Sequence, residues 1–216
     1  MKDIAIYGAG GYGREVACYL KSINNKNTEW NLIGFFDDGA EIGTEQQYGT
    51  ILGGINELNK WETELAVVFA IGSPKTIRTI VSKITTPRIY FPNIIDPSVN
   101  FLDKESVKMG KGNVIGPNSV ISCNVTLGDF NMINLLCHLG HEVVLGDYNV
   151  LMPSVNICGG VTIGNDNLLA IKTTVLQYLT VSDNVFLGAG GILMADTKSD
   201  CRYFGNPAKP IMKNKN

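Results

Sequence analysis

VTLGDFN at residues 125–131 returns eighteen residues later as VVLGDYN at 143–149, and again as VTIGNDN at 161–167. A shorter period of six lies inside this period of eighteen. Every sixth residue from Met109 to Leu187 is aliphatic or methionine, which makes fourteen matches without a break, and glycine follows at seven of them. Nested periods of six and eighteen predict a coil with three short strands per turn and a corner after each strand.

The period also predicts which side chains fill the coil. The aliphatic residue of each hexad points inward, and Gly, Asn and Asp occupy the corners, where a positive φ costs least. Because the register is unbroken from 109 to 187, we expect about five turns and no long loop within them. An interior of Ile, Leu and Val leaves no room for a ligand, so any binding site must lie on the outside of the coil.

The chain before the coil has a different pattern, in which strands alternate with helices. The expected elements are strands at 2–7, 31–36 and 64–71 and helices at 14–23 and 76–84. This alternation is typical of a small parallel sheet with crossover helices, a Rossmann-like half-domain. We therefore predict an α/β domain over residues 1–92, a proline-flanked connector, and a parallel β-helix domain with a C-terminal tail over residues 98–216.

A glycine-rich turn joins the first expected strand to the first helix. The pattern GxGxxG is matched by Gly8, Gly10, Gly11 and Gly13. Free backbone N–H groups and the start of a helix favour an anion such as phosphate there. Asp37 and Asp38 end the second strand and can accept hydrogen bonds from a ribose or a base, and Gly72 ends the third strand.

These features fit one nucleotide or sugar nucleotide better than NAD. A dinucleotide normally needs two mononucleotide-binding halves, and only about 90 residues precede the coil. The alternative is that the glycines serve only a tight turn and close helix packing.

Composition excludes several classes of protein. The 216 residues carry 18 Lys and Arg against 20 Asp and Glu, a net charge of −2, so the composition gives little support to a nucleic-acid surface. No apolar run reaches the ~20 residues of a membrane span, and the N-terminus enters a glycine turn instead of a secretory signal. Five cysteines without a CxxC pair predict neither a disulfide framework nor a zinc site. We expect a cytoplasmic protein.

The two histidines, His138 and His141, are the candidates for acid–base chemistry. A histidine suits removal of a proton from an amine or hydroxyl that attacks a thioester. Glu142 can orient the His141 ring, and Gly159, eighteen residues later at the same corner, can donate its N–H to an oxyanion. We expect no metal, because only Glu142 is near enough to be a third ligand. A structural surface histidine is the alternative.

Four stretches of the chain together resemble one family of enzymes. They are YGAGGYGREV (7–16), the run from Ile133-Asn134 to His141-Glu142, CGGVTIG (158–164) and GNPAKP (205–210). These stretches are similar to the hexapeptide-repeat sugar acetyltransferases, of the bacillosamine N-acetyltransferase and sialic acid O-acetyltransferase type. The resemblance implies a left-handed β-helix, acetyl-CoA as co-substrate, and a homotrimer with active sites between neighbouring coils.

The resemblance also implies roles for particular residues. His141 with Glu142 would be the general base, and Gly159 would bind the acetyl carbonyl. Coenzyme A would lie along Ala170 and Gly188, with Lys209 near its phosphates. The substrate pocket would be formed by Gly8, Gly10, Gly11, Gly13, Asp37, Asp38, Gly72 and Asn134.

The reaction expected from this resemblance is direct acetyl transfer from acetyl-CoA to a nucleotide-linked amino-deoxy sugar of the 4-amino type. O-acetylation of a sugar such as sialic acid is the first alternative. An NAD-dependent oxidoreductase and a non-catalytic trimeric scaffold are further alternatives from other classes. The carrier nucleotide stays open between UDP, dTDP and GDP.

Overall fold

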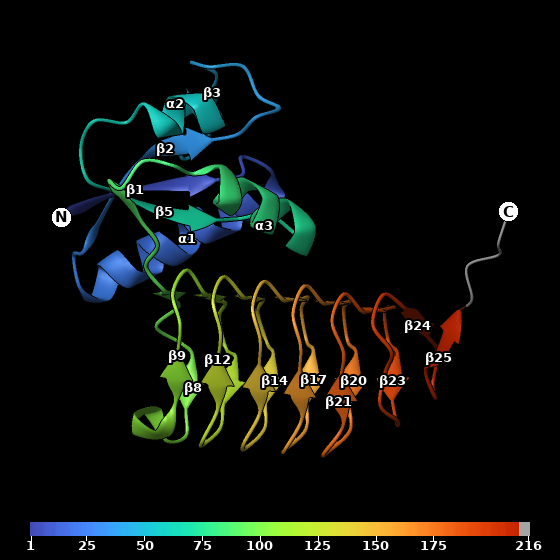
Figure 1. Ribbon diagram of the computed structural model, residues 1–216. Helices are drawn as coiled ribbons and strands as arrows, with labels where there is room; N and C mark the ends of the chain where they lie inside the picture. The colour runs from blue at the N-terminus through green and yellow to red at the C-terminus, as the bar shows by residue number, and fades with distance from the viewer. Residues whose placement is uncertain (212–216) are drawn as a thin grey trace, which may run out of the picture. The chain divides into compact units, whose positions relative to one another are not determined.

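The computed structural model describes residues 1–211 (Figure 1). The chain divides into two compact units. The first comprises Met1–Pro97 with Lys111–Val114, and the second comprises Ser98–Gly110 with the residues from Ile115 onward. No helix within residues 1–211 is long and apolar enough to cross a membrane.

The first unit is built on a six-stranded sheet with the order β3-β4-β2-β1-β5-β6. Its elements are β1 (Lys2–Tyr7), α1 (Gly11–Lys26), β2 (Trp30–Phe36), β3 (Glu45–Gln46), β4 (Gly49–Gly53), α2 (Ile55–Asn59), β5 (Leu65–Phe69), α3 (Pro74–Lys83), β6 (Ile89–Tyr90) and β7 (Ile94–Ile95). Strand β1 pairs in parallel with both β2 and β5, so their carboxyl ends lie at one edge of the sheet. This is the α/β arrangement expected from the alternation of strands and helices.

The apolar residues of β1 explain why this sheet forms the core of the unit. Ile4 and Ile6 are fully buried, as are Val68 of β5 and Val16 of α1, and the four belong to one hydrophobic cluster. A strand buried on both faces needs such a continuous apolar run. One layer of the core therefore lies between the central strands and helix α1, and the residues of β1 on the other face, Ala5 and Tyr7, are buried as well.

Two details of this unit differ from the sequence prediction. Helix α1 begins at Gly11, inside the glycine pattern, and continues to Lys26. The elements β3, β4 and α2 were not predicted, because two to five residues are too few to show a period. Residues of α2 nevertheless form one wall of the pocket described below.

The second unit is a coil of two-residue strands, seen as parallel rungs in Figure 1. The strands are β8 (Asn100–Phe101), β9 (Lys108–Met109), β10 (Val114–Ile115), β11 (Val120–Ile121), β12 (Thr126–Leu127), β13 (Met132–Ile133), β14 (His138–Leu139), β15 (Val144–Leu145), β16 (Val150–Leu151), β17 (Asn156–Ile157), β18 (Thr162–Ile163), β19 (Leu168–Leu169), β20 (Thr174–Val175), β21 (Thr180–Val181), β22 (Phe186–Leu187) and β23 (Ile192–Leu193). A short 3₁₀ helix, η1 (Lys104–Ser106), interrupts the coil only before β9. The pair β24 (Arg202–Phe204) and β25 (Lys209–Ile211) is antiparallel and follows the last rung.

Three sheets of parallel strands form the sides of the coil. Their orders within this unit are β23-β20-β17-β14-β11-β8, β21-β18-β15-β12-β9, and, for the third, β24-β22-β19-β16-β13-β10, to which β25 is added as an antiparallel strand beside β24. From β9 to β23, strands pair with the strand eighteen residues away, as in Leu139 with Ile157. The second residue of each strand from β9 to β22 is the predicted inward position, and all but Met109 are buried. The predicted coil and its unbroken register are confirmed.

The prediction about the corners was wrong in part. The left-handed backbone falls three residues after each inward position, at Gly112, Asn118, Asn124, Phe130, Leu136, Glu142, Tyr148, Ser154, Gly160, Asp166, Lys172, Tyr178, Asn184 and Gly190. The glycines directly after the inward residues do not adopt a positive φ. They are needed for close stacking: a Cβ on Gly128 would lie 2.8 Å from the carbonyl oxygen of Gly146 on the next turn.

Asparagines eighteen residues apart form a ladder inside the coil. Asn131, Asn149 and Asn167 are fully buried. The Asn131 Oδ1 accepts hydrogen bonds from Asn149 N and Nδ2, at 2.9 and 3.0 Å, and Asn149 Oδ1 accepts the equivalent pair from Asn167. The ladder satisfies polar groups that would otherwise be unpaired in the interior.

Candidate active site

The three corners of each turn line up into three edges of the coil. The histidine edge consists of residues 122–124, 140–142, 158–160 and 176–178. The apolar edge consists of residues 116–118, 134–136, 152–154, 170–172 and 188–190. The ladder edge consists of residues 110–112, 128–130, 146–148, 164–166 and 182–184. The predicted site residues of the second unit lie on the first two edges and on β25.

His141 and Glu142 lie together on the histidine edge, just after β14. The His141 Nδ1 is 3.4 Å from a Glu142 carboxylate oxygen, and their side chains are 53% and 61% exposed. The Glu142 N–H donates to the carbonyl of Cys123 at 3.0 Å, which fixes the backbone of this corner. Glu142 therefore faces Nδ1, and the Nε2 atom of His141 is left for another partner.

The His141 ring lies against Gly159 on the next turn. A Cβ added at Gly159 would overlap the ring, with Cε1 only 2.5 Å away. A Cβ on Gly140 would lie 2.6 Å from the Gly159 nitrogen. Within residues 1–211, the Gly159 N–H donates no hydrogen bond. The arrangement thus brings a histidine and an uncommitted backbone donor side by side at an exposed corner.

The other groups near this corner that could take part in chemistry, His138 and Cys137, are not placed beside His141 and Gly159 in this way. His138 is exposed on the outer face of β14. No group of three His, Cys, Asp or Glu side chains in the described part of the chain could hold a metal ion. The Cys137 thiol donates to the Met152 carbonyl at 3.3 Å, and burial raises its pKa to about 12. A buried, protonated thiol is not a nucleophile.

Asn134, Ala170 and Gly188 lie on the apolar edge, one sheet away from His141. Gly188 is buried, because the Phe204 ring covers it: a Cβ there would be 2.5 Å from Phe204 Cε1. Lys209 is paired with Phe204 in the β24–β25 register. The structure therefore brings Gly188 under the Phe204 ring and pairs the backbone of Lys209 with that of Phe204, and both residues lie away from the histidine edge.

Sequence reasoning did not find this aromatic cluster. The Arg202 guanidinium lies 4.5 Å from the centre of the Phe186 ring, and the Phe186 and Phe204 rings are 5.5 Å apart. The only signal in the sequence is the order Arg-Tyr-Phe just after the coil, where the hexad period no longer applies.

The four glycines of the first unit divide into two kinds. Gly8 and Gly13 are buried, and a Cβ on Gly8 would lie 2.6 Å from the Ala70 carbonyl oxygen. Gly10 and Gly11 are exposed and have open space around them, as Gly72 does. Close packing accounts for the first kind. Only the second kind leaves room for a ligand.

Asp37 and Asp38 follow β2 and are hydrogen-bonded to the turns around them. Asp37 accepts from the N–H groups of Ala9 and Gly39, at 2.8 and 2.9 Å. Asp38 accepts from the Tyr7 hydroxyl at 2.7 Å and from the Ile55 N–H at 2.9 Å. Burial, and then this bond to Asp38, raise the pKa of the Tyr7 hydroxyl. Both carboxylates thus help to hold the glycine turn and helix α2 in place.

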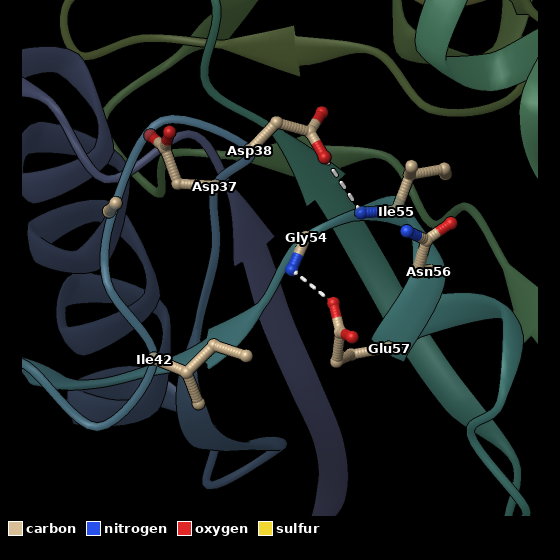
Figure 2. A pocket seen from close by; sticks show the side chains of 8 residues that line it. Asp37, Asp38, Ile42, Gly54, Ile55, Asn56 and Glu57 are labelled. Carbon is tan, nitrogen blue, oxygen red and sulfur yellow. Dashed lines mark hydrogen bonds between the residues drawn. The ribbon is translucent and has the colours of Figure 1, made fainter.

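A pocket of about 220 Å³ opens beside these carboxylates (Figure 2). It is lined by Asp37, Asp38, Ala40, Ile42, Gly54, Ile55, Asn56 and Glu57. Glu57 accepts from the Gly54 N–H at 2.9 Å, and this bond lowers the pKa of its carboxyl group. With three carboxylates and no cation in its lining, the pocket suits hydroxyl and N–H donors of a ribose or a base and disfavours phosphate.

Comparisons with known proteins agree with this architecture. Residues 3–84 match the family described as the PglD N-terminal domain. A histidine-to-asparagine variant of perosamine N-acetyltransferase from Caulobacter crescentus, solved with CoA and GDP-perosamine, superimposes with a TM-score of 0.85 at 22% identity, over 99% of this chain and 98% of that one. The chain has the fold of this acetyltransferase.

Two further solved structures share that fold. The acetyltransferase domain of PglB from Neisseria gonorrhoeae FA1090, with acetyl coenzyme A, has a TM-score of 0.86 at 24% identity, over 97% of this chain and 99% of that one. WeeI from Acinetobacter baumannii AYE has a TM-score of 0.85 at 21% identity, over 98% and 100%. A search of curated proteins finds no match. The predicted fold, an α/β unit followed by a left-handed β-helix, is confirmed.

Proposed function

We propose that this protein is an acetyl-CoA-dependent N-acetyltransferase that acts on a nucleotide-linked amino-deoxy sugar of the 4-amino type. The observation that carries the proposal is the contact between His141 and Gly159, whose N–H is uncommitted, with Glu142 at the other ring nitrogen. A base next to an oxyanion donor is the arrangement that acyl transfer requires.

The proposed reaction is a single displacement at the thioester. The amino nitrogen of the sugar attacks the acetyl carbonyl carbon, and a C–N bond forms as the C–S bond breaks. His141 Nε2 accepts the proton from the amine and then returns it to the thiolate of CoA. Glu142 holds the ring by Nδ1 and stabilises the cation that His141 becomes.

Gly159 would stabilise the negative charge of the intermediate. Its N–H is the donor, and a single oxyanion donor of this kind typically contributes ~10² to 10³ in kcat. Glycine is also the only amino acid at position 159 that leaves space for the His141 ring where it is observed, because any Cβ there would overlap the ring. The two residues therefore form one functional unit.

CoA would bind along Ala170 and Gly188, with Lys209 near its phosphates. Ala170 and Gly188 lie on the apolar edge and Lys209 begins β25, whereas His141 lies on the histidine edge. A thioester bound along the apolar edge of one chain would therefore meet the His141 of another. This separation supports a homotrimer with active sites between subunits.

The acceptor nucleotide would bind in the first unit. The open turn at Gly10, Gly11 and Gly72 would face the diphosphate, and the pocket beside Asp37 and Asp38 would take the ribose or base. In this proposal residues 1–92 recognise the sugar nucleotide and residues 98–216 transfer the acetyl group, with Asn134 contacting the substrate. Support comes from a relative of the same fold that was solved with both CoA and GDP-perosamine.

Release of free CoA thiol from acetyl-CoA tests the proposal. The acceptors would be UDP-, dTDP- and GDP-linked 4-amino sugars, with the matching 4-hydroxy sugars and free sialic acid alongside. We expect turnover with one amino sugar nucleotide. Turnover only with a hydroxyl acceptor would replace N-acetylation by O-acetylation, and no binding of acetyl-CoA would overturn the proposal as a whole.

A further inference from the structure

Tyr178 is an exposed aromatic residue on the histidine edge that the proposed chemistry does not use. It follows β20 and lies eighteen residues after Gly160. Its side chain is 72% exposed, although its backbone N–H donates to the Gly159 carbonyl at 3.1 Å. The backbone of Tyr178 is therefore fixed directly to the proposed oxyanion residue.

The ring of Tyr178 lies over Gly160 in the way that the ring of His141 lies over Gly159. A Cβ added at Gly160 would be 2.6 Å from Tyr178 Cε1. The Gly160 N–H also donates to the His141 carbonyl at 2.8 Å. Two exposed rings, one from the turn before and one from the turn after, thus cover the α-carbons of two consecutive glycines.

Neither the backbone conformation of the corner nor packing into the core accounts for a tyrosine at position 178. The residue has a φ of 62°, a conformation that Asn accepts more readily and adopts at Asn118 and Asn124. Phe130 and Tyr148 also have this conformation on the ladder edge, but their rings stack on each other at 5.2 Å and Phe130 is 3% exposed. Within residues 1–211, the Tyr178 ring has no aromatic partner and its hydroxyl makes no hydrogen bond.

We propose that Tyr178 binds the pantetheine arm of acetyl-CoA and so positions the thioester beside His141 and Gly159. This inference rests on the proposed function. The ring would pack on the methylene groups of the arm, and the hydroxyl would hydrogen-bond to its first amide. The acetyl carbonyl would then stay at the Gly159 N–H.

Dimensions favour the arm of CoA over the acceptor sugar as the partner of Tyr178. Consecutive turns of the coil are ~4.8 Å apart, the spacing of paired strands. The first amide nitrogen of the arm is four bonds from the thioester carbonyl carbon, on the order of 5 Å. Tyr178 is also one turn beyond Gly159 toward the end of the coil that carries β25 and Lys209. In the groove proposed between the histidine edge of one chain and the apolar edge of another, the arm would therefore run from Gly159 past Tyr178.

The test is the variant Tyr178→Asn, which removes the ring and keeps a residue suited to the corner. We expect the Kd of CoA, measured by calorimetry, and the KM of acetyl-CoA to rise about five- to tenfold, the size of one aromatic contact. The KM of the acceptor should stay within about twofold. Tyr178→Phe retains the packing and loses only the hydroxyl, so its effect should be smaller.

Tyr148→Asn is the matched control, because it removes a corner tyrosine from the ladder edge. Its Kd for CoA should equal that of the wild type, and thermal unfolding of both variants would show whether the fold is kept. Unchanged affinity for CoA in Tyr178→Asn, or a rise in the acceptor KM alone, would overturn the role of Tyr178 while wild-type turnover upholds the proposed function. A wild-type protein that binds no CoA would overturn both.

Discussion

Single residues explain why the proposed base and oxyanion donor are coupled. The His141 ring occupies the space that a side chain on Gly159 would need. Gly159 itself does not have a positive φ, so alanine is compatible with its backbone but not with the ring. Glycine at this position is therefore required by a neighbouring side chain, not by conformation.

The first prediction concerns His141. His141→Ala should lower kcat by ~10² to 10⁴, the usual contribution of a general base. Stability should hardly change, because more than half of the side chain is exposed. His138→Ala, three residues earlier on the outer face of β14, is the control and should keep the wild-type rate. Equal rates for the two variants would remove His141 from the mechanism.

The second prediction concerns Gly159. Gly159→Ala should displace the His141 ring and lower kcat by about 10²-fold, the cost of misplacing a reacting group by about 1 Å. The backbone N–H is retained, so the Kd of CoA should stay close to its wild-type value. Steady-state kinetics and calorimetry would separate the two effects. A wild-type kcat would show that the observed packing of the ring is unimportant for the reaction.

At the scale of elements, asparagine ladders between turns add to the stabilisation that the apolar interior gives the coil. Two-residue strands offer few backbone hydrogen bonds each, and the buried asparagines add bonds that run along the axis. The Asn149 side chain alone also donates to the Gly164 carbonyl at 2.9 Å. Consecutive turns are therefore joined by side chains as well as by sheets.

The third prediction tests this ladder. Asn149→Ala should lower the free energy of unfolding by about 3 kcal/mol, because it leaves buried partners such as the Asn167 N–H and the Gly164 carbonyl without their bonds. Denaturant unfolding would measure the loss. Asn156→Ala, an exposed asparagine of β17, is the control and should change stability by no more than about 0.5 kcal/mol. Similar losses in both variants would mean that the ladder adds nothing.

At the scale of the whole molecule, the two units are proposed to bind different substrates. The first has an anionic pocket of about 220 Å³ and an open glycine turn. The second has the histidine and apolar edges. Under this division, a substitution in the first unit should alter the affinity for the sugar nucleotide and leave the affinity for CoA unchanged.

The fourth prediction tests that division. Asp38→Asn removes one of the three negative charges in the pocket and weakens acceptance of a ribose or base donor. We expect the KM of the sugar nucleotide to rise about tenfold or more, since hydrogen bonds to charged groups contribute about 1.5–3 kcal/mol. The Kd of CoA should not change. Weaker CoA binding, or an unchanged acceptor KM, would contradict the assignment of the pocket.

How much of this site could be predicted differs between the two units. His141, Glu142 and Gly159 could be paired in advance, because a period of eighteen places residues 141 and 159 on adjacent turns. Glu57 and Asn56 could not be found, because their elements are too short to show a pattern. Helix α2, which carries both residues, is held beside Asp38 by the hydrogen bond from the Ile55 N–H to the Asp38 carboxylate. The two partners are seventeen residues apart, so their contact depends on the packing of the sheet.

The coil, its register and the inward side chains could be read from the sequence, because each follows from a local period that repeats, and the order of the two units follows from the change of pattern before residue 98. The fold in three dimensions was needed to show which glycines serve packing, which serve turns and which leave open space, as at Gly13, Gly160 and Gly10. It alone put Phe204 over Gly188 and Tyr178 over Gly160. The physical reason is that a repeat specifies the backbone, whereas these contacts depend on side chains from different turns or from segments far apart in the chain.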